Sequence, residues 1–358
     1  MIKLNKIYFN KLDNPASDFF KHLRFHWRRG HGHRLRYMWN RVRWHVYPAL
    51  GKAGAYPDHV DLELSSSCNM KCAMCYTTTD RFKHEVPHKS LDFELFKKIV
   101  DELADNGVYS IRLSWRGEPT LNPRFMDCVR YARARGIKEI DSLTNGYKLT
   151  EAMFSELVDL KMSWLTISFD GTGETYEKIR APAKYDDMIR KITRFNEIKK
   201  EKGAVSPVIR VQGVWPAISE DPERYFDTFE PIVDEVSANS LLDYLRKDDK
   251  FERLPDYVCP VPFQRLVIGS DGRAFMCIND ELGQVCIGDL NKESVYHVWN
   301  GKKMAEVRQT HLRAQGADKL APCAVCYLPR KTRMKGYKVG SRTIQLEELV
   351  GREMVVGR

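Results

Sequence analysis

The strongest constraint on the fold is a repeated alternation of short apolar runs with longer segments of helical periodicity, between residues 58 and 245. His59 to Leu64 alternates apolar and polar residues, as a strand does. Apolar residues then recur at helical spacing from Ser90, a candidate N-cap, to Asn106-Gly107, where the pattern ends. The same order continues, and it predicts strands at 108–115, 138–143, 164–169, 208–214 and 236–242, and helices at 123–135, 150–160, 184–202 and 222–233.

Strands that alternate with helices at this spacing form a parallel sheet with right-handed crossovers. Six such units predict an α/β fold, a partial (β/α)6 barrel that is similar to an open TIM barrel. In such barrels ligands bind at the carboxyl ends of the strands. Functional residues are therefore expected in the loops that follow the strands.

A compact set of three cysteines follows the first strand. Cys68, Cys72 and Cys75 have the spacing C-x3-C-x2-C. Three thiolates can hold three corners of a four-iron cluster and leave the fourth iron open, whereas a structural zinc or a closed cluster takes four protein ligands. The spacing therefore favours a cluster with an open iron. Half of a zinc site and three unrelated core thiols are the alternatives.

Turn motifs follow the next three strands. They are Arg116-Gly117-Glu118-Pro119, Thr144-Asn145-Gly146 and Ser168-Phe169-Asp170-Gly171. Gly, Asn and Asp are common in any turn, so each motif alone is weak. Their shared position after consecutive strands predicts one site, built around the three cysteines.

Together the cysteines and these motifs resemble the radical S-adenosylmethionine (SAM) superfamily, over residues 57–242. The resemblance implies that the three cysteines bind a [4Fe-4S] cluster whose open iron chelates SAM. It also implies that Glu118 accepts the SAM ammonium group, beside Gly117 and Pro119. The family often has Gly-Gly-Glu there, and Arg116 takes the place of the first glycine. The other SAM contacts that the resemblance implies are Asn145 and Ser168 for the ribose and carboxylate, and Met74, Tyr76 and Val211 near the adenine. Asp170 is a further candidate for SAM binding, and ordinary turn chemistry is the alternative for Ser168 and Asp170.

Four further cysteines lie beyond the sixth strand, at Cys259, Cys277, Cys323 and Cys326. Residues 264–276 predict a β-hairpin, and residues 294–312 predict a helix before the last two cysteines. This order resembles the SPASM/twitch extension of radical SAM enzymes in its one-cluster form. The resemblance implies an auxiliary [4Fe-4S] cluster with four thiolate ligands, which suits electron transfer better than substrate binding. A structural Zn(Cys)4 site is the alternative.

Two cysteines remain. Cys128 lies at an apolar helix position and is expected in the core. Cys286, inside the extension, is either a small buried residue or a hydrogen-atom donor to a substrate radical.

Residues 1–57 are basic and rich in aromatic residues. A helical extension that packs its aromatic residues on the main domain would account for this composition. Contact with an anionic membrane surface or a polyanionic substrate is the second possibility, and nucleic acid is an unlikely partner. The remaining segments are expected to be the barrel at 58–245, the auxiliary-cluster domain at 246–332, and a tail at 333–358 with a short helix at 346–356.

No apolar run reaches the ~18 residues of a membrane span, and the N-terminus lacks the apolar stretch of a secretory signal. Nine cysteines without such a signal predict a reducing cytoplasm. Contact with the inner membrane surface is an option there.

The resemblance implies that the reduced first cluster cleaves SAM to a 5′-deoxyadenosyl radical, which takes a hydrogen atom from the substrate. The one-cluster extension favours a dehydrogenase that oxidises a carbinol of a sugar, cyclitol or glycan precursor, with the auxiliary cluster as electron acceptor. The alternatives are epimerisation with Cys286 as hydrogen donor, crosslinking of a peptide, and a zinc-binding scaffold without enzymatic activity.

The net charge of +10 suits an acidic flavodoxin or ferredoxin as the reductant. Arg116, Arg180 and Arg210 are expected at the mouth of the barrel, where they would bind charges on a polar or anionic substrate.

Overall fold

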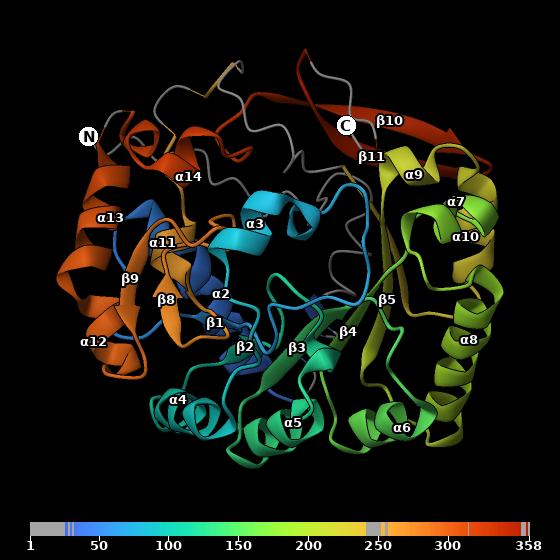
Figure 1. Ribbon diagram of the computed structural model, residues 1–358, viewed down its shortest axis with the longest axis horizontal. Coiled ribbons are helices and arrows are strands. Elements are labelled where there is room, and N and C mark those ends of the chain that lie inside the picture. The colour runs from blue at the N-terminus through green and yellow to red at the C-terminus, as the bar shows by residue number, and fades with distance from the viewer. Residues whose placement is uncertain are drawn as a thin grey trace.

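The computed structural model describes residues 26–27, 29–30, 32–240, 252–254, 257–313, 315–351 and 356. Its centre is a nine-stranded sheet with the order β6-β5-β4-β3-β2-β1-β7-β8-β9 (Figure 1). The strands β1 to β7 are all parallel to one another, and the pairs β7–β8 and β8–β9 are antiparallel. Within the described residues the edge strands β6 and β9 do not pair with each other, so the barrel is open there. The expected α/β partial barrel is confirmed.

The strands of the sheet are β1 (His59–Leu62), β2 (Ser110–Arg112), β3 (Glu139–Thr144), β4 (Trp164–Ser168), β5 (Val208–Val214), β6 (Glu235–Asn239), β7 (Arg265–Ile268), β8 (Arg273–Phe275) and β9 (Cys286–Asp289). The helices between β1 and β6 are α3 (Asp80–Glu85), α4 (Phe93–Asp105), α5 (Phe125–Ala134), α6 (Glu151–Asp159), α7 (Gly173–Ile179), α8 (Tyr185–Glu201), α9 (Trp215–Ile218) and α10 (Pro222–Phe229). The helices α4, α5, α6 and α8 follow the outside of the curved sheet in Figure 1. All six predicted strands are present, whereas α3 and α7 were not predicted.

Helix α4 shows how the sequence pattern becomes structure. Its side chains Phe96, Ile99, Val100 and Leu103 are buried in the core, as their helical spacing predicts. The N-cap is Asp92, whose carboxylate accepts a hydrogen bond from the Leu95 amide at 2.9 Å. The predicted cap Ser90 was wrong, because Ser90 instead forms a bridge with Ser65 at the start of the cysteine loop.

The auxiliary domain continues the barrel sheet. The predicted hairpin is present as β7 and β8, and β7 also pairs in parallel with β1, from His59↔Arg265 to Leu62↔Ile268. The predicted helix at 294–312 is two helices, α12 (Val295–Asn300) and α13 (Lys302–Leu312). Gly301 separates them in an extended conformation, and a Cβ atom there would lie 2.6 Å from the His297 carbonyl oxygen. The helix α11 (Val261–Gln264) precedes β7, and η3 (Gly316–Lys319) and α14 (Ala321–Ala324) follow α13.

The described part of the tail is a β-hairpin, so the short helix predicted at 346–356 was wrong for residues 346–349, and residues 352–355 lie outside the described residues. Strands β10 (Thr332–Val339) and β11 (Arg342–Leu349) pair across a two-residue turn, in which Gly340 has φ +57°. Such a turn favours a hairpin over a helix. The hairpin is attached to α10 by Arg342, which donates hydrogen bonds to Asp227 at 2.7 Å and Glu230 at 2.9 Å.

The N-terminal helix α2 (Arg34–Ala49) covers the amino ends of the barrel strands. Tyr37 packs against Tyr109, just before β2, with 6.0 Å between ring centroids, and Trp44 meets His59 edge-on at 6.4 Å. The prediction that the aromatic residues pack on the main domain is therefore confirmed for the buried face of this helix. Residues 1–25 of the expected N-terminal segment lie outside the described residues. In the described part of the chain, none of the helices is both long and apolar enough to cross a membrane.

Candidate SAM and iron–sulfur sites

The first three cysteines lie in the loop between β1 and the single turn η1 (Tyr76–Thr78). The loop folds back on itself, because the Cys75 amide donates a hydrogen bond to the Cys72 carbonyl oxygen at 2.9 Å. Burial, together with the charges of Glu118, Cys75 and Cys72, raises the pKa of the Cys68 thiol to about 11. The three thiols therefore lie close enough to interact electrostatically, next to the motif that follows β2.

The loop after β2 packs directly on the cysteine loop. A Cβ atom on Gly117 would collide with the Ser67 carbonyl oxygen and would lie 2.5 Å from that of Ser65. The Glu118 amide donates a hydrogen bond to the same Ser67 oxygen at 2.8 Å. Only glycine fits at position 117, because the two backbones approach too closely for a side chain.

The Glu118 carboxylate links the loops after β2 and β3. One of its oxygens accepts hydrogen bonds from the Thr120 amide, the Thr120 hydroxyl at 2.7 Å and the Thr144 hydroxyl at 2.6 Å. The other oxygen accepts from the Asn145 amide at 2.7 Å. The side chain is almost fully buried, and Pro119 starts the short helix η2 (Pro119–Leu121) beside it. The predicted SAM contact thus also holds the architecture of the site.

Two further predicted residues are hydrogen-bonded to neighbouring loops. The Asn145 amide side chain donates to Asn69 of the cysteine loop at 2.8 Å. Asp170, which is buried, accepts from the Val214 amide at 2.8 Å and from Arg180 Nε at 2.7 Å. The structure thereby joins the ends of β3, β4 and β5 to one another and to the cysteines.

Arg180 also lies near the cluster ligands. Burial raises the pKa of the Cys72 thiol, while the Arg180 guanidinium opposes that shift. Arg180 was also expected to bind charges on the substrate. Its guanidinium forms an ion pair with Asp170, so its positive charge is already balanced within the protein.

The predicted adenine contacts differ in accessibility. Val211 is fully buried in the hydrophobic core, and its neighbours Gln212 and Val214 on β5 are partly exposed. Met74 and Tyr76 are partly exposed beside the cysteines. The partly exposed Ser168 pairs with Gln212 at the carboxyl ends of β4 and β5.

Arg116 does not face the barrel mouth, and its predicted substrate role was wrong. Its guanidinium is buried in a bidentate pair with Glu63, at 2.6 and 2.5 Å, and it donates to the Glu281 carbonyl oxygen at 3.2 Å. Arg210 pairs with Glu235 at 3.3 Å and lies 4.8 Å from the Trp164 ring centroid. Both arginines are committed to acidic partners within the protein.

The four later cysteines come together. Cys259, Cys277, Cys323 and Cys326 line one small cavity between α11, α13 and α14. Burial, together with the charge of Cys326, raises the pKa of the Cys259 thiol to about 12. The Asn279 amide donates to Cys277 Sγ at 3.4 Å and the Leu328 amide to Cys326 Sγ at 3.5 Å. Backbone donors aimed at sulfur stabilise thiolates.

Sequence reasoning missed His311 at this cavity. Its Nε2 lies 3.7 Å from Cys323 Sγ, its Nδ1 is buried without a hydrogen-bond partner, and burial lowers its pKa to about 4. The only sequence signal was a histidine on the inner face of a helix that precedes C-x2-C, which is too common to single out.

The known families that match agree with both sites. The radical SAM superfamily matches residues 62–212, and the SPASM iron–sulfur cluster-binding domain matches residues 259–327. The first match contains the three-cysteine loop, and the second contains all four later cysteines.

The chain carries a radical SAM domain followed by a SPASM domain. A radical SAM domain binds SAM at a [4Fe-4S] cluster, and a SPASM domain binds auxiliary iron–sulfur clusters. The expected cofactors are therefore confirmed at the level of the two domains.

Curated relatives of this radical SAM protein match its barrel region. The tungsten-containing aldehyde ferredoxin oxidoreductase cofactor-modifying protein of Pyrococcus furiosus is 33% identical over 36% of this chain and 39% of its own length. The mycofactocin maturase MftC of Mycobacterium tuberculosis is 30% identical over 36% of this chain and 32% of its own length. The chain thus spans well under half of the length of these relatives.

Solved structures share the fold over more of the chain. Streptococcus suis SuiB bound to precursor peptide SuiA has a TM-score of 0.56 at 12% identity, covering 91% of this chain and 80% of that one. BtrN in complex with AdoMet and 2-DOIA has a TM-score of 0.51 at 17% identity, covering 75% and 92%. Native anSMEcpe with bound AdoMet has 0.54 at 16%, covering 75% and 88%. At these identities the likeness concerns the fold alone.

Among the residues that the structure describes, His59, Glu139 and Asp141 bring three candidate ligand atoms within 4.8 Å of one another.

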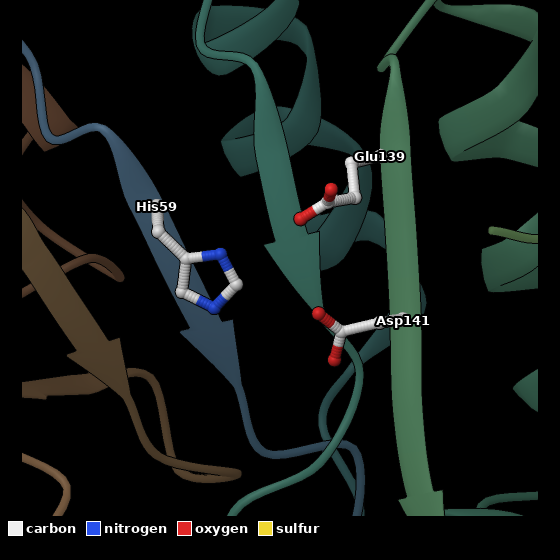
Figure 2. A group of neighbouring side chains, drawn as sticks. All are labelled: His59, Glu139 and Asp141. Atoms are coloured by element: carbon white, nitrogen blue, oxygen red, sulfur yellow. The ribbon is translucent and has the colours of Figure 1, made fainter. Parts of the chain in front are cut away.

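The His59, Glu139 and Asp141 group is an ion-pair network at the barrel floor (Figure 2). Its carboxylates already have cationic partners, since Arg29 pairs with Glu139, and Arg112 donates to Asp141 at 2.6 Å. Burial lowers the pKa of His59, so the imidazole is neutral, and it bonds to Ser110 Oγ at 2.6 Å. With its charges balanced in this way, the group needs no metal ion.

The last two cysteines do not line the cavity of the four later cysteines. Cys128 is buried in α5, which confirms its predicted place in the core. Cys286 begins β9, and its thiol donates to the Gly288 carbonyl oxygen at 3.4 Å. Because β9 is three strands from β1, it is about 14 Å away across the sheet.

Proposed function

We propose that this radical SAM protein oxidises a carbinol of a polar substrate, such as a sugar, cyclitol or glycan precursor, to a ketone. The observation that carries the proposal is the convergence of Cys259, Cys277, Cys323 and Cys326 on one cavity. Four thiolates complete a closed auxiliary site, which suits electron acceptance. When bound, SAM and the clusters supply hydrogen-atom abstraction and one-electron acceptance, so the carbinol loses one hydrogen atom, one electron and one proton.

The chain itself supplies position and shielding. Cys68, Cys72 and Cys75 would hold the first cluster, and Glu118 would accept the SAM ammonium group. The hydrogen bonds of Glu118 to Thr144 and Asn145 fix its carboxylate before SAM arrives. A preorganised acceptor of this kind loses little entropy on binding.

A polar substrate is supported by the partly exposed side chains at the strand ends. Ser168 and Gln212 lie side by side on β4 and β5 and offer hydroxyl and amide groups. The arginines first expected there are paired with acids, so the proposal rests on hydrogen-bonding groups and not on free cations. We propose an acidic flavodoxin or ferredoxin as the reductant, because the net charge is +10.

Modification of a peptide is the second candidate. Its support is the similarity to the maturase MftC and to SuiB, whose complex with the precursor peptide SuiA covers 91% of this chain. Epimerisation with Cys286 as donor has weaker support, because that thiol is bonded within its own strand.

The first test is anaerobic reconstitution with iron and sulfide, on the wild type and on Cys68→Ala/Cys72→Ala/Cys75→Ala and Cys323→Ala/Cys326→Ala variants. We expect about eight irons per chain in the wild type and about four in either variant. One iron–sulfur cluster plus one bound zinc would contradict the electron-acceptor role.

The second test identifies the substrate class. Wild-type protein, SAM and dithionite are incubated with deuterated cyclitols and sugars, or with deuterated peptides, and 5′-deoxyadenosine is analysed by mass spectrometry. We expect deuterium in 5′-deoxyadenosine from a carbinol carbon, with ketone formed only when the Cys323/Cys326 site is intact. Deuterium transfer from peptides alone would favour the second candidate.

A further inference from the structure

Helix α2 is apolar on two opposite faces. Tyr37, Asn40, Trp44 and Pro48 are buried against the barrel floor. On the other side Leu35 is 84% exposed, Met38 61% and Trp39 59%. A helix on the surface of a protein normally has a polar outer face, so this second apolar face calls for a physical reason.

The exposed apolar residues form one continuous stripe, which we call the α2 stripe. Its members are Leu35, Met38, Trp39, Val42, Val46 and Leu50. With about 100° between successive residues, they fall within one sector of about 120°, opposite the buried face. The described chain has fourteen exposed large apolar residues, and seven of them are the six stripe residues and Trp27. Single exposed apolar residues scattered over a surface are ordinary, whereas half of those in the described chain lie in this one short segment.

Positive charge borders the stripe on both sides. Arg34 and Arg41 lie at one edge by helical position, and Arg36 and Arg43 at the other. Arg34 and Arg36 are exposed, and the Arg34 guanidinium lies 3.3 Å from the centroid of the exposed Trp27 ring. Residues 19–57 contain nine Lys and Arg and no Asp or Glu. An apolar stripe with tryptophan between rows of arginine is the pattern of helices that lie in the interface of an anionic bilayer.

We propose that the α2 stripe docks the protein on an anionic phospholipid bilayer, with the helix lying in the membrane interface. Trp39 and its apolar neighbours enter the headgroup region, and the exposed Arg34 and Arg36 contact lipid phosphates, whereas Arg43 pairs with Asp58 at 3.0 Å. A protein partner or a second copy of the chain would not require an acid-free segment of this length. A polyanion such as RNA would not require the apolar stripe.

The docked orientation leaves the catalytic side free. Trp44 of α2 contacts His59 at the amino end of β1, whereas Cys68 follows the carboxyl end of the same strand. The stripe and the SAM site therefore lie at opposite ends of the barrel. Membrane docking would hold the enzyme at the bilayer with the barrel mouth directed away from it.

The test is co-sedimentation of the full-length protein with vesicles of phosphatidylcholine alone, or with one-quarter phosphatidylglycerol. We expect binding to the anionic vesicles that weakens at high salt, and at least about tenfold weaker binding to the neutral ones. Trp39→Gln/Val42→Gln should weaken anionic binding by at least about tenfold, and Arg34→Gln/Arg36→Gln by about thirtyfold.

The matched control is Val205→Gln/Met334→Gln, which changes two exposed apolar residues outside α2 and should leave binding unchanged. Circular dichroism checks that each variant is folded. Anionic binding that the Trp39/Val42 variant retains would overturn the proposal. So would a wild-type dimer that this variant converts to monomer, because a second copy would then be the occupant. RNA binding that depends on Arg34 and Arg36 but not on Trp39 would assign the surface to a polyanion.

Discussion

At the scale of single residues, the SAM site is built from side chains that hold one another before any ligand binds. Glu118 accepts from Thr120, Thr144 and Asn145, and Gly117 lets two backbones touch. The residue that the family resemblance assigns to the SAM ammonium group thus has a second task. The two tasks can be separated, because the donors to Glu118 can be changed without changing its charge.

Glu118→Gln should lower the free energy of unfolding and also weaken SAM binding. Both carboxylate oxygens of Glu118 accept hydrogen bonds, so the NH2 group of glutamine would face a donor and leave it without an acceptor. Such an unsatisfied buried donor costs about 1–3 kcal/mol. It would also remove the negative charge that we propose for the SAM ammonium group. Thr144→Val is the control, since it removes one donor to Glu118 and keeps the carboxylate. Denaturant unfolding and equilibrium dialysis with SAM measure the two effects. Equal loss of SAM affinity in both variants would show that Glu118 acts through architecture alone.

At the scale of elements, strong periodicity predicted most of the barrel. The strand β5 has the predicted bounds, and α4, α6 and α8 lie within one to three residues of them. Short elements such as α3 and α7 were missed, because so few residues show no clear period. The hairpin β10–β11 was misassigned, although Gly340-Ser341 between alternating segments is a hairpin signal.

The residues of the candidate site also differ in how far the sequence could predict them. The seven cysteines predicted to bind clusters stand out in the sequence because thiols at short fixed spacings, in a chain of this kind, are mostly metal ligands. The pairing of Arg116 with Glu63 could not be predicted, because the sequence does not indicate which acidic residue a buried arginine will pair with. His311 and the acids of the barrel floor likewise meet their neighbours only through the fold.

The ion pair between the N-terminal segment and the barrel predicts that the free energy of unfolding depends on pH. Burial alone would raise the pKa of Glu139, but the Arg29 guanidinium outweighs it and lowers that pKa to about 2. The stabilisation from this pair is present above the ordinary carboxyl pKa and is lost as the pH falls toward 2. Arg29→Gln should therefore lower the free energy of unfolding by about 2–3 kcal/mol at pH 7.

The same comparison at pH 3 should show a smaller difference, because part of the stabilisation is already lost in the wild type. Arg130→Gln, which breaks an exposed pair with Glu156, is the control and should cost less than about 1 kcal/mol at either pH. Urea unfolding of the cofactor-free protein measures these values. A difference for Arg29→Gln that is the same at pH 7 and pH 3 would contradict the assignment.

At the scale of the whole molecule, the barrel and the auxiliary domain share one buried junction. Arg116 bonds to Glu63 after β1 and to the Glu281 carbonyl oxygen in the auxiliary domain. Glu63 also accepts from the Ser270 amide at 2.9 Å, and Trp115 donates to the Ile278 carbonyl oxygen at 2.7 Å. A break in this junction should therefore disturb both iron sites together.

Arg116→Met should lower the free energy of unfolding by about 3–5 kcal/mol, because it leaves the Glu63 carboxylate buried without its cation. We expect lower iron content at both sites after reconstitution. Glu63→Gln/Arg116→Met should recover part of the stability, since no uncompensated charge remains. Arg81→Met, at an exposed pair with Glu85, is the control. Iron loss confined to the first site would show that the junction does not couple the two domains.

The parallel pairing of β7 with β1 has a consequence for electron tunnelling. The strand that leads into the SAM-cluster loop is hydrogen-bonded to the strand whose hairpin leads to Cys277. Tunnelling rates fall steeply with distance, and a hinge between the two clusters would make each turnover depend on domain motion. A shared sheet removes that hinge, so the gap an electron must cross is set when the protein folds and stays the same whichever substrate occupies the barrel.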